Sequence, residues 1–398
     1  MLTRSGLAAA VAAVVLAGAG WWWRYEELVV VAGALAAAVG VALAAARGTS
    51  GLVVTRFVPD PRVARGDPIN VEYRVANRVR SRSVTVTIVD RATPAPLEST
   101  VRPARPADDP VVVRTRVDPI DKLERADVSA GIPTHRRGVV IVGPWELERL
   151  DPFGLAVGRQ ASTVTSRIIV HPRVHLLGGP YGEMHSIQDD ALVRRSRSDP
   201  MSGFVSLREY VDGDDPRLIH WPTSARMGAL MLREHIELRR PEFTVVLDTA
   251  TPPDATGGPD AAAFADDFEE MVDVTASIAV HALRSGVEVR LRTTDREHPG
   301  AGTALEHDTQ VLDLLTPVLP TGPDHTLALA ATLYGQAAVQ HSGAMVVVVT
   351  GPRGPSQALG SIVAARVVRV GEGALGAPGI DLAVDNAREF ARRWVPWE

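Results

Sequence analysis

The chain of 398 residues contains no cysteine. This absence excludes disulfide bonds, thiolate metal sites and cysteine nucleophiles, but it fits either redox compartment. Lysine is nearly absent too, because Lys122 is the only one and arginine carries the rest of the basic charge. The formal net charge of -5 supplies no broad cationic field of the kind that binding to a phosphate backbone usually needs. We therefore expect no nucleic-acid partner.

Charged residues are also missing from two stretches near the N-terminus, residues 5–23 and 28–46. Each reaches the roughly 20 residues that a helix needs to cross the hydrocarbon core of a bilayer. The pattern predicts a transmembrane helical hairpin over residues 1–48. A cleaved signal peptide is the alternative for the first stretch, since its "AGAG" offers small residues, but the second apolar stretch argues against simple export.

Residues that flank these stretches predict an orientation in the membrane. The turn is aromatic, with Trp21, Trp22, Trp23 and Tyr25, and amphipathic rings favour the membrane interface. Arginines outside the turn are Arg4, Arg47 and Arg56, whereas Arg24 in the turn is offset by Glu26 and Glu27. Because basic flanks stay on the cytoplasmic side, we expect a multi-pass protein of the cell membrane whose soluble domains are cytoplasmic.

Short β-branched runs separated by Gly, Pro, Asn and Asp fill residues 49–178. In "INVEYRVAN" apolar residues alternate with polar ones, which predicts a strand with one buried face. Turn residues such as Gly66 and Asn77 tolerate a reversal of the backbone between strands. An all-β, immunoglobulin-like antiparallel sandwich is the economical interpretation. The other strand-like runs are "SVTVTIVD", "PVVVRTRV" and "GVVIVGPWELERL".

Strand and helix patterns alternate over residues 241–398. Uniformly apolar runs such as "FTVVLD" and "AMVVVVT" between amphipathic helices predict a parallel sheet covered on both faces, an α/β domain of the Rossmann type. Ligands of such sheets commonly bind at the carboxyl ends of the strands, and Asp248 ends the first one. Residues 179–240 form a linker that carries a polar motif.

That motif, "GFVSLREYVDGDDPRLIHWPTSAR", gathers acids, arginines and aromatics over residues 203–226. "VSLREY" predicts a strand. "VDGDDP" predicts a turn in which Gly213 supplies an unusual backbone angle and Asp214 or Asp215 caps a helix. Pro216 would open that helix at its first position, and Arg217, His220 and Trp221 would share one of its faces.

Three interpretations of the motif remain open. The first is a structural role. A guanidinium group can bind a carboxylate through two parallel hydrogen bonds, so we expect a partly buried ion network that joins two domains. Its members would be Arg208, Arg217, Arg226, Asp212, Asp214 and Asp215. A docking surface for a protein partner is the second, because Trp, Tyr and Arg are favoured hot-spot residues. A hydrolytic site with Asp214 as base and His220 as its partner is the third. We expect no catalysis, since no serine elbow, zinc-binding histidine pair or phosphate loop accompanies these acids.

The candidate residues for partner binding or for structure share this one stretch. They are Arg208, Glu209, Tyr210, Gly213, Asp214, Asp215, Arg217, His220, Trp221, Ser224 and Arg226.

The order R-E-Y, an acidic G-D-D, R, I-x-W and S-A-R in this motif resembles the signature of the bacterial family known as domain of unknown function 58. "RRGVVIVGPWELERLDPFGLA" and "VHPRV" are also similar to segments that precede the signature in that family. The resemblance implies a membrane-anchored protein that is often encoded beside a MoxR-type AAA+ ATPase. It also implies that the α/β domain is similar to a von Willebrand factor A domain.

A von Willebrand factor A-like domain raises the possibility of a metal-dependent adhesion site, which uses D-x-S-x-S after the first strand. This chain has "DTATP", which keeps Asp248 but places Ala250 and Pro252 at the two serine positions. Because a hard divalent cation needs several oxygen ligands, we expect no Mg²⁺ or other cofactor, and Asp248 is a weak candidate only.

Two further groups of polar residues carry no functional prediction. His171 and His175 lie four apart, but "VHPRVH" is strand-like and contains a proline, so a helical metal site is not expected there. The four acids of "DDFEE", residues 266–270, are expected to form a solvated helix face.

Taken together, these features predict a membrane-anchored, non-catalytic protein-interaction or assembly factor. The resemblance implies a MoxR-type AAA+ ATPase as its partner, and other membrane or envelope proteins are expected partners too. The alternatives are an envelope-related hydrolase that uses the acidic motif and a metal-dependent adhesion protein that acts through Asp248.

Overall fold

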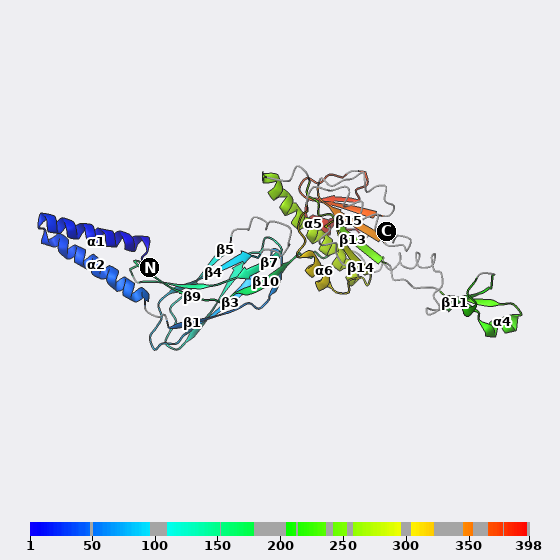
Figure 1. Cartoon of the computed structure of the whole chain (residues 1–398), viewed down its shortest axis with the longest axis horizontal. Helices are drawn as coiled ribbons and strands as arrows, with labels where there is room; N and C mark the ends of the chain where they lie inside the picture. The colour runs from blue at the N-terminus through cyan, green and yellow to red at the C-terminus, as the bar shows by residue number, and fades with distance from the viewer. Residues whose placement is uncertain are drawn as a thin grey trace. The chain divides into compact units, whose positions relative to one another are not determined.

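The structure, a computed structural model, falls into two compact units, Met1–His171 and Pro172–Glu398, here called the N-terminal and C-terminal units (Figure 1). The described residues are 1–47, 51–95, 110–151, 153–178, 204–211, 214–235, 242–252, 258–295, 304–321, 345–352, 365–376 and 378–395.

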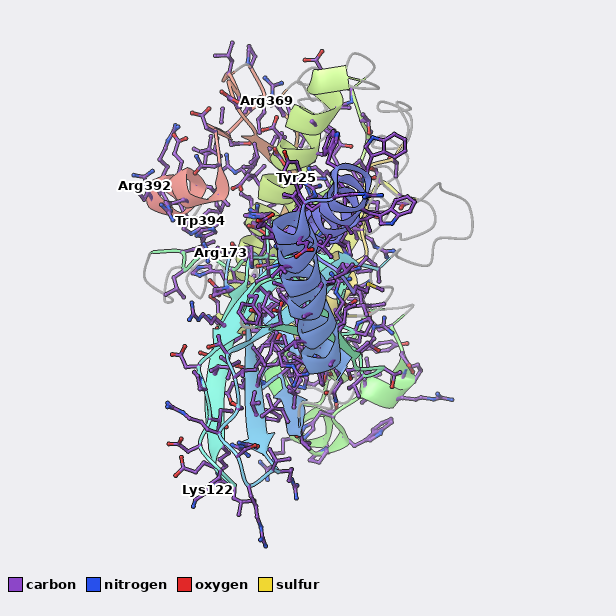
Figure 2. All side chains as sticks on the ribbon, turned by 90° about the vertical axis from the view of Figure 1, so that its left-hand side faces the viewer. Tyr25, Lys122, Arg173, Arg369, Arg392 and Trp394 are labelled. Atoms are coloured by element: carbon purple, nitrogen blue, oxygen red, sulfur yellow. The ribbon has the colours of Figure 1, made fainter. Side chains whose placement is uncertain are left out.

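Two helices, α1 (Arg4–Trp23) and α2 (Glu26–Arg47), form the predicted hairpin at the start of the N-terminal unit (Figure 1). Both are long and apolar enough to cross a membrane, by length and composition. Their large valines are mostly exposed, and their buried residues are mostly small. The aromatic side chains of the turn, Tyr25 among them (Figure 2), are exposed and do not pack into a core. The buried residues of the hairpin are Gly6, Ala13, Gly20, Ala32, Val39 and Ala42.

Two β-sheets that share one hydrophobic core make up the rest of the N-terminal unit. The smaller sheet has the order β1-β3-β6, and the larger has the order β2-β10-β7-β4-β8-β9 with β5 paired to β4. Strand β3 buries alternate residues, as its sequence pattern predicts. The strands are β1 (Leu52–Phe57), β2 (Arg62–Ala64), β3 (Ile69–Asn77), β4 (Val86–Pro94), β5 (Val111–Val117), β6 (Arg125–Ile132), β7 (Gly138–Val142), β8 (Glu146–Leu150), β9 (Val157–Ala161) and β10 (Ser166–His171).

The two residues expected at strand reversals behave differently. Gly66 has a φ of 86°, which confirms the turn predicted there. Asn77 instead ends β3, and its side-chain amide donates hydrogen bonds to the carbonyl oxygens of Ser81 and Ile120, at 2.8 and 3.1 Å. Asparagine at this position therefore organises two loops through its side chain.

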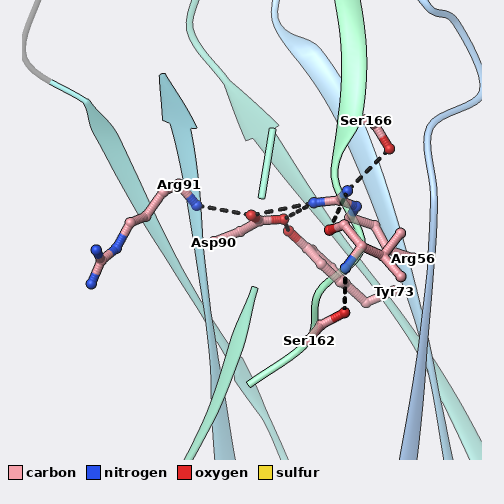
Figure 3. Close-up of polar contacts among 7 residues, drawn as sticks. Arg56, Tyr73, Asp90, Arg91, Ser162 and Ser166 are labelled. Carbon is pink, nitrogen blue, oxygen red and sulfur yellow. Dashed lines mark hydrogen bonds and ion pairs between the residues drawn. The ribbon is translucent and has the colours of Figure 1, made fainter. Parts of the chain in front are cut away.

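A buried charged cluster around Asp90 joins the two sheets (Figure 3). Asp90 lies on β4 of the larger sheet, and its Oδ2 lies 3.1 Å from Nη1 of Arg56 on β1, with both side chains 1% exposed. Tyr73 on β3 donates its hydroxyl to the same oxygen at 2.7 Å, and the N–H of Arg91 donates to Oδ1 at 2.8 Å. Burial, and then the hydrogen bond to Asp90, raise the pKa of the Tyr73 phenol. Each oxygen of this buried carboxylate thus has a donor.

The position of Arg56 corrects its role in the predicted membrane orientation. Its Nη2 donates to the carbonyl oxygen of Val164 and to Ser166 Oγ, at 3.1 and 3.0 Å, so the guanidinium group is held inside the sandwich. A buried guanidinium that is paired with a carboxylate provides no positive charge at a membrane surface. Arg4 and Arg47 are the basic flanks that remain for the positive-inside rule.

The C-terminal unit contains a parallel sheet with the order β14-β13-β15-β16-β17, which confirms the predicted α/β domain. One face packs against α5 through side chains such as Phe268 and Met271. A second apolar cluster that includes Val246 and Val348 lies on the other face. The elements are β13 (Glu242–Leu247), α5 (Gly258–Arg284), β14 (Glu288–Thr293), α6 (Asp308–Leu315), β15 (Met345–Thr350), β16 (Ala365–Val370), β17 (Leu382–Val384) and α8 (Ala387–Arg393). Residues 325–340, "HTLALAATLYGQAAVQ", have a helical pattern in the sequence and lie outside the described residues.

Residues 172–178, which the sequence-based boundary assigns to the sandwich, pack on α5 of the C-terminal unit. The N–H of Arg173 donates to Asp273 Oδ1 at 2.8 Å, and the N–H of His175 donates to Ser277 Oγ at 2.9 Å. These backbone contacts place the end of the N-terminal unit at His171.

Of the four acids at residues 266–270 of α5, Asp266 is exposed but the other three are not, so most of this face is not solvated, contrary to the prediction. Glu269 is buried, and Asp267 Oδ1 accepts a hydrogen bond from the N–H of Glu372 at 2.9 Å. Glu270 Oε2 accepts from the N–H of Ala387, the first residue of α8, at 2.9 Å. Burial raises the pKa of Asp267. These carboxylates bind backbone N–H groups of segments distant in sequence, which helical periodicity does not reveal.

The first prediction concerns the buried cluster. Replacing Asp90 by Asn removes the negative charge and leaves the Arg56 guanidinium buried without a counter-charge. We expect this to cost about 3–5 kcal/mol of unfolding free energy. Hydrogen exchange of β4 peptides in a urea series, on protein in lipid nanodiscs, measures the loss.

Asp127→Asn is the matched control for Asp90→Asn. It breaks the ion pair between Arg74 and Asp127, in which Arg74 Nε lies 2.9 Å from Asp127 Oδ1. Both side chains of this pair are 61% exposed. An exposed pair contributes little to stability, because water screens both charges. Equal losses in the two variants would contradict a special role for the buried cluster.

Candidate functional site

The motif residues build a small hairpin, here called the 204–235 module, of which Asp212 and Gly213 lie outside the described residues. Strand β11 (Phe204–Glu209) pairs antiparallel with β12 (Met231–His235). A 3₁₀ helix η1 (Pro216–Leu218) and a short helix α4 (Trp221–Met227) lie between the strands. The order strand, turn and helix is therefore present, as the sequence predicts.

The predicted helix is divided, so Arg217, His220 and Trp221 do not share one helical face. Arg217 belongs to η1, His220 is the N-cap of α4, and Trp221 is the first residue of α4. Pro222 has no N–H to donate to the preceding turn, so a continuous helix cannot pass this point. Extended Ile219, which bridges to Leu232 on β12, separates the two helices.

A bidentate ion pair closes the turn after β11. Arg208 Nη1 donates to Asp214 Oδ2 and Arg208 Nη2 donates to Asp214 Oδ1, both at 2.7 Å. The N–H of Val211 also donates to Asp214 Oδ2, at 2.9 Å. The hydrogen bond from Arg208, followed by the one from Val211, lowers the pKa of the Asp214 carboxyl. Asp214 is therefore an ionised acceptor with its donors in place.

The other polar residues of the module cap its helices. Asp215 is the N-cap of η1 and accepts from the N–H of Arg217 at 2.9 Å. His220 Nδ1 lies 2.8 Å from Thr223 Oγ1. Ser224 Oγ accepts from the N–H of Met231 at 2.8 Å and ties α4 to β12. Each of these groups has a partner within the module, and no hydrogen bond between described residues joins Asp214 to His220.

Large side chains of the module lie in solvent. Trp221 and Met227 are 64% and 65% exposed. Arg217 and Arg226 are exposed too, and neither forms an ion pair with a residue that the structure describes. The predicted network of three arginines and three acids is thus, among the described residues, the single Arg208–Asp214 clamp, because η1 and α4 turn the other two guanidinium groups toward water.

Asp248 directly follows β13, at the point between β13 and β15 where the strand order of the sheet reverses. Ligands of open α/β sheets bind at such a point. The Asp248 side chain is buried, and its Oδ2 accepts from Thr350 Oγ1 at 2.8 Å. Its Oδ1 accepts from the N–H of Ala250 at 3.2 Å and from Thr294 Oγ1 at 3.4 Å. The carboxylate thus joins the carboxyl ends of neighbouring strands.

The residues around Asp248 do not fit a hard cation. Ala250 and Pro252 carry no side-chain oxygen, and both oxygens of Asp248 already accept hydrogen bonds. Within the described ranges no group of three or more His, Asp or Glu side chains is placed to hold a metal ion, His171 and His175 included. Thr294 was not singled out in the sequence, because it directly follows β14 and only the pairing of β13 with β14 brings it beside Asp248. Thr350 ends the apolar strand β15.

Comparison with known proteins gives one family. Residues 206–365 match the family model described as "Protein of unknown function DUF58", and this match supports the resemblance carried by the motif. No curated protein matches the chain.

Similarity to solved structures is weak. An alkylpurine DNA glycosylase from Pseudomonas fluorescens is 10% identical, with 33% of each chain covered and a TM-score of 0.21. The CARDB domain of a Pyrococcus furiosus protein is 11% identical, over 30% of this chain and 94% of that one, with a TM-score of 0.19. The sporulation control protein Spo0M from Bacillus subtilis is 12% identical, over 41% and 58%, with a TM-score of 0.19. The chain spans about a third of the glycosylase, and these scores carry no argument about fold or function.

The second prediction concerns the clamp and pH. Because the pKa of Asp214 is lowered in the fold, the clamp stabilises the module above the ordinary Asp pKa. That contribution is lost as the pH falls through the lowered value. We expect Asp214→Asn to lose hydrogen-exchange protection in β11 and β12 at every pH and to show no such acid transition.

The matched control for Asp214→Asn is Asp215→Asn, one residue along. Asparagine caps a helix about as well as aspartate, so protection should stay near that of the parent protein. If both variants lose the same protection, the clamp does not organise the module.

The third prediction concerns Asp248. Asp248→Ala leaves buried hydroxyl and N–H donors without their acceptor, at a cost of about 1–3 kcal/mol. We expect a lower thermal midpoint, by the same amount with and without Mg²⁺. A midpoint that Mg²⁺ raises in the parent protein but not in Asp248→Ala would instead establish a cation site.

Proposed function

We propose that this protein is a membrane-anchored protein-interaction or assembly factor, that it works with a MoxR-type AAA+ ATPase, and that it has no catalytic site of its own. One observation carries the proposal. In the 204–235 module the acids, the histidine and the serine described above bond within the module, whereas Trp221 and Met227 are exposed. Arg217 and Arg226 are exposed too and form no ion pair with any residue in the described part of the chain. Exposed tryptophan and arginine side chains are typical of a protein-binding hot spot.

The membrane part of the proposal is supported by which residues of α1 and α2 are exposed. Small residues are buried and valines such as Val14 and Val30 are exposed. Water disfavours such a surface, whereas lipid-embedded helices commonly pack through small residues and turn large apolar ones outward. The remaining basic flanks, Arg4 and Arg47, place the soluble domains in the cytoplasm in this proposal.

The ATPase and the finer fold assignments come from the family resemblance, which the match over residues 206–365 supports. The two sheets around one core are consistent with an immunoglobulin-like sandwich. The parallel sheet with Asp248 at its first strand is consistent with a von Willebrand factor A-like domain whose metal site is degenerate. An adhesion-type scaffold without a complete set of metal ligands favours binding of a protein partner over chemistry.

The fourth prediction tests the docking surface. We expect Trp221→Ala or Arg217→Ala to weaken binding of the MoxR-type ATPase of the same bacterium by about 2 kcal/mol or more, roughly thirtyfold in Kd. Affinity is measured on the full chain in lipid nanodiscs. Leu375→Ala is the matched control, because Leu375 is also a highly exposed apolar residue but lies outside the 204–235 module, after β16 of the parallel sheet.

Two results would contradict the proposal. Unchanged affinity in Trp221→Ala and Arg217→Ala, or no binding of the ATPase by the parent protein, would exclude this docking surface. Turnover of an envelope component that is lost in Asp214→Asn, with the hydrogen-exchange pattern of the module intact, would identify a hydrolase instead.

A further inference from the structure

The loop between β8 and β9, of which Asp151 and residues 153–156 are described, is bound to the start of the helical hairpin within the N-terminal unit. Thr3, the N-cap of α1, donates its N–H to the carbonyl oxygen of Leu155 at 2.9 Å and its hydroxyl to that of Gly154 at 2.7 Å. Leu2 forms a β-bridge with Ala156. Since the apolar stretch of α1 begins directly after Arg4, this loop lies at the level where α1 would enter a membrane.

The end of α2 meets the same hairpin. The Arg149 guanidinium on β8 donates to the carbonyl oxygen of Ala45 in the last turn of α2. On β9, a Cβ at Gly158 would collide with the carbonyl oxygen of Ala46, so glycine permits this close approach. The β8–β9 hairpin therefore contacts the two helix ends that face the sandwich, which are the start of α1 and the end of α2.

Asp151 gives the loop a defined shape. Its side chain is buried, and its Oδ2 accepts from the N–H of Phe153 at 2.9 Å while its Oδ1 accepts from the N–H of Ala156 at 2.6 Å. Gly154 has a φ of 66°, which reverses the chain. Although the loop is closed on itself, Phe153 is 63% exposed and Leu150, at the end of β8, is 54% exposed.

We propose that Phe153 and Leu150 insert into the headgroup region of the bilayer that α1 and α2 cross, and thereby hold the sandwich against the membrane surface. The proposal rests on the anchoring part of the proposed function and is independent of the ATPase. The occupant is lipid because the loop is bonded to the ends of both apolar helices, so these side chains continue the apolar surface of the hairpin. Aromatic and apolar side chains are favoured at this depth.

The absence of cysteine makes a direct test possible. Phe153→Cys, labelled with an environment-sensitive fluorophore, is reconstituted as the full chain in vesicles of phosphatidylcholine and phosphatidylglycerol that carry nitroxide-labelled lipids at two depths. We expect a blue-shifted emission and quenching by the shallow nitroxide, which corresponds to a depth of roughly 5–10 Å. Leu150→Cys is the second test position, in case the first label disturbs the loop.

Phe57→Cys is the matched control. Phe57 is the same residue type as Phe153 and is 59% exposed, but it lies at the far end of β1. Its distance along the strand from Leu52, the first strand residue after the helical hairpin, is about 17 Å. A label at 57 should stay in water and escape quenching by either nitroxide.

Val14→Cys on α1 separates this inference from the proposed anchoring. Deep quenching at 14 with no quenching at 150 or 153 overturns the inference and leaves the anchoring intact. No quenching at 14 overturns the anchoring and this inference with it. Shielding of 153 from aqueous iodide without quenching by lipid nitroxides would mean that protein covers the loop, which also overturns the proposal.

Discussion

The pairing of Arg56 with Asp90 inside the sandwich is the interaction on which the arrangement of the N-terminal unit depends. Arg56 lies on β1, the strand that follows α2, and Asp90 lies on β4 of the sheet that carries β8 and β9. The loop between β8 and β9 in turn bonds to the start of α1. A buried charge pair tolerates little displacement, because loss of either partner leaves an uncompensated ion. The apolar hairpin and both sheets are thereby linked into one unit.

Carboxylates of the C-terminal unit act as acceptors for their own chain. Asp214 binds Arg208, Asp215 caps η1, Asp248 joins strand ends, and Asp267 holds a backbone N–H of a distant segment. A general acid or base must exchange its proton with a substrate, which a carboxylate with all its donors in place does poorly. The 204–235 module instead exposes Trp221, Met227 and the guanidinium groups of Arg217 and Arg226, which form no ion pair with a residue that the structure describes, and for this reason we propose recognition as its function.

Predictions from the sequence succeeded where a short-range pattern decides the structure. Alternation in "INVEYRVAN" predicts β3, uniformly apolar runs predict β13 and β15, and the length of two uncharged stretches predicts the hairpin. Predictions from the sequence failed where a residue that is distant in the chain decides the local structure. The sequence places Arg56 among the membrane flanks because nothing nearby reveals Asp90. It suggests solvent for Asp267 and Glu270 because their N–H partners lie over a hundred residues away. Pro222 is the local signal in the sequence for the division of the helix.

The sequence by itself determined the order of the elements, the apolar N-terminal hairpin and the motif that resembles a known family, because periodicity, length and residue type act over a few neighbouring residues. Only the tertiary structure decided which arginine meets which acid, that Asp248 is enclosed by threonines, and that Phe153 stands beside the helix ends. Those outcomes depend on contacts between residues far apart in the chain. The identity of a charged or aromatic residue does not reveal whether its side chain is buried in a pair or exposed.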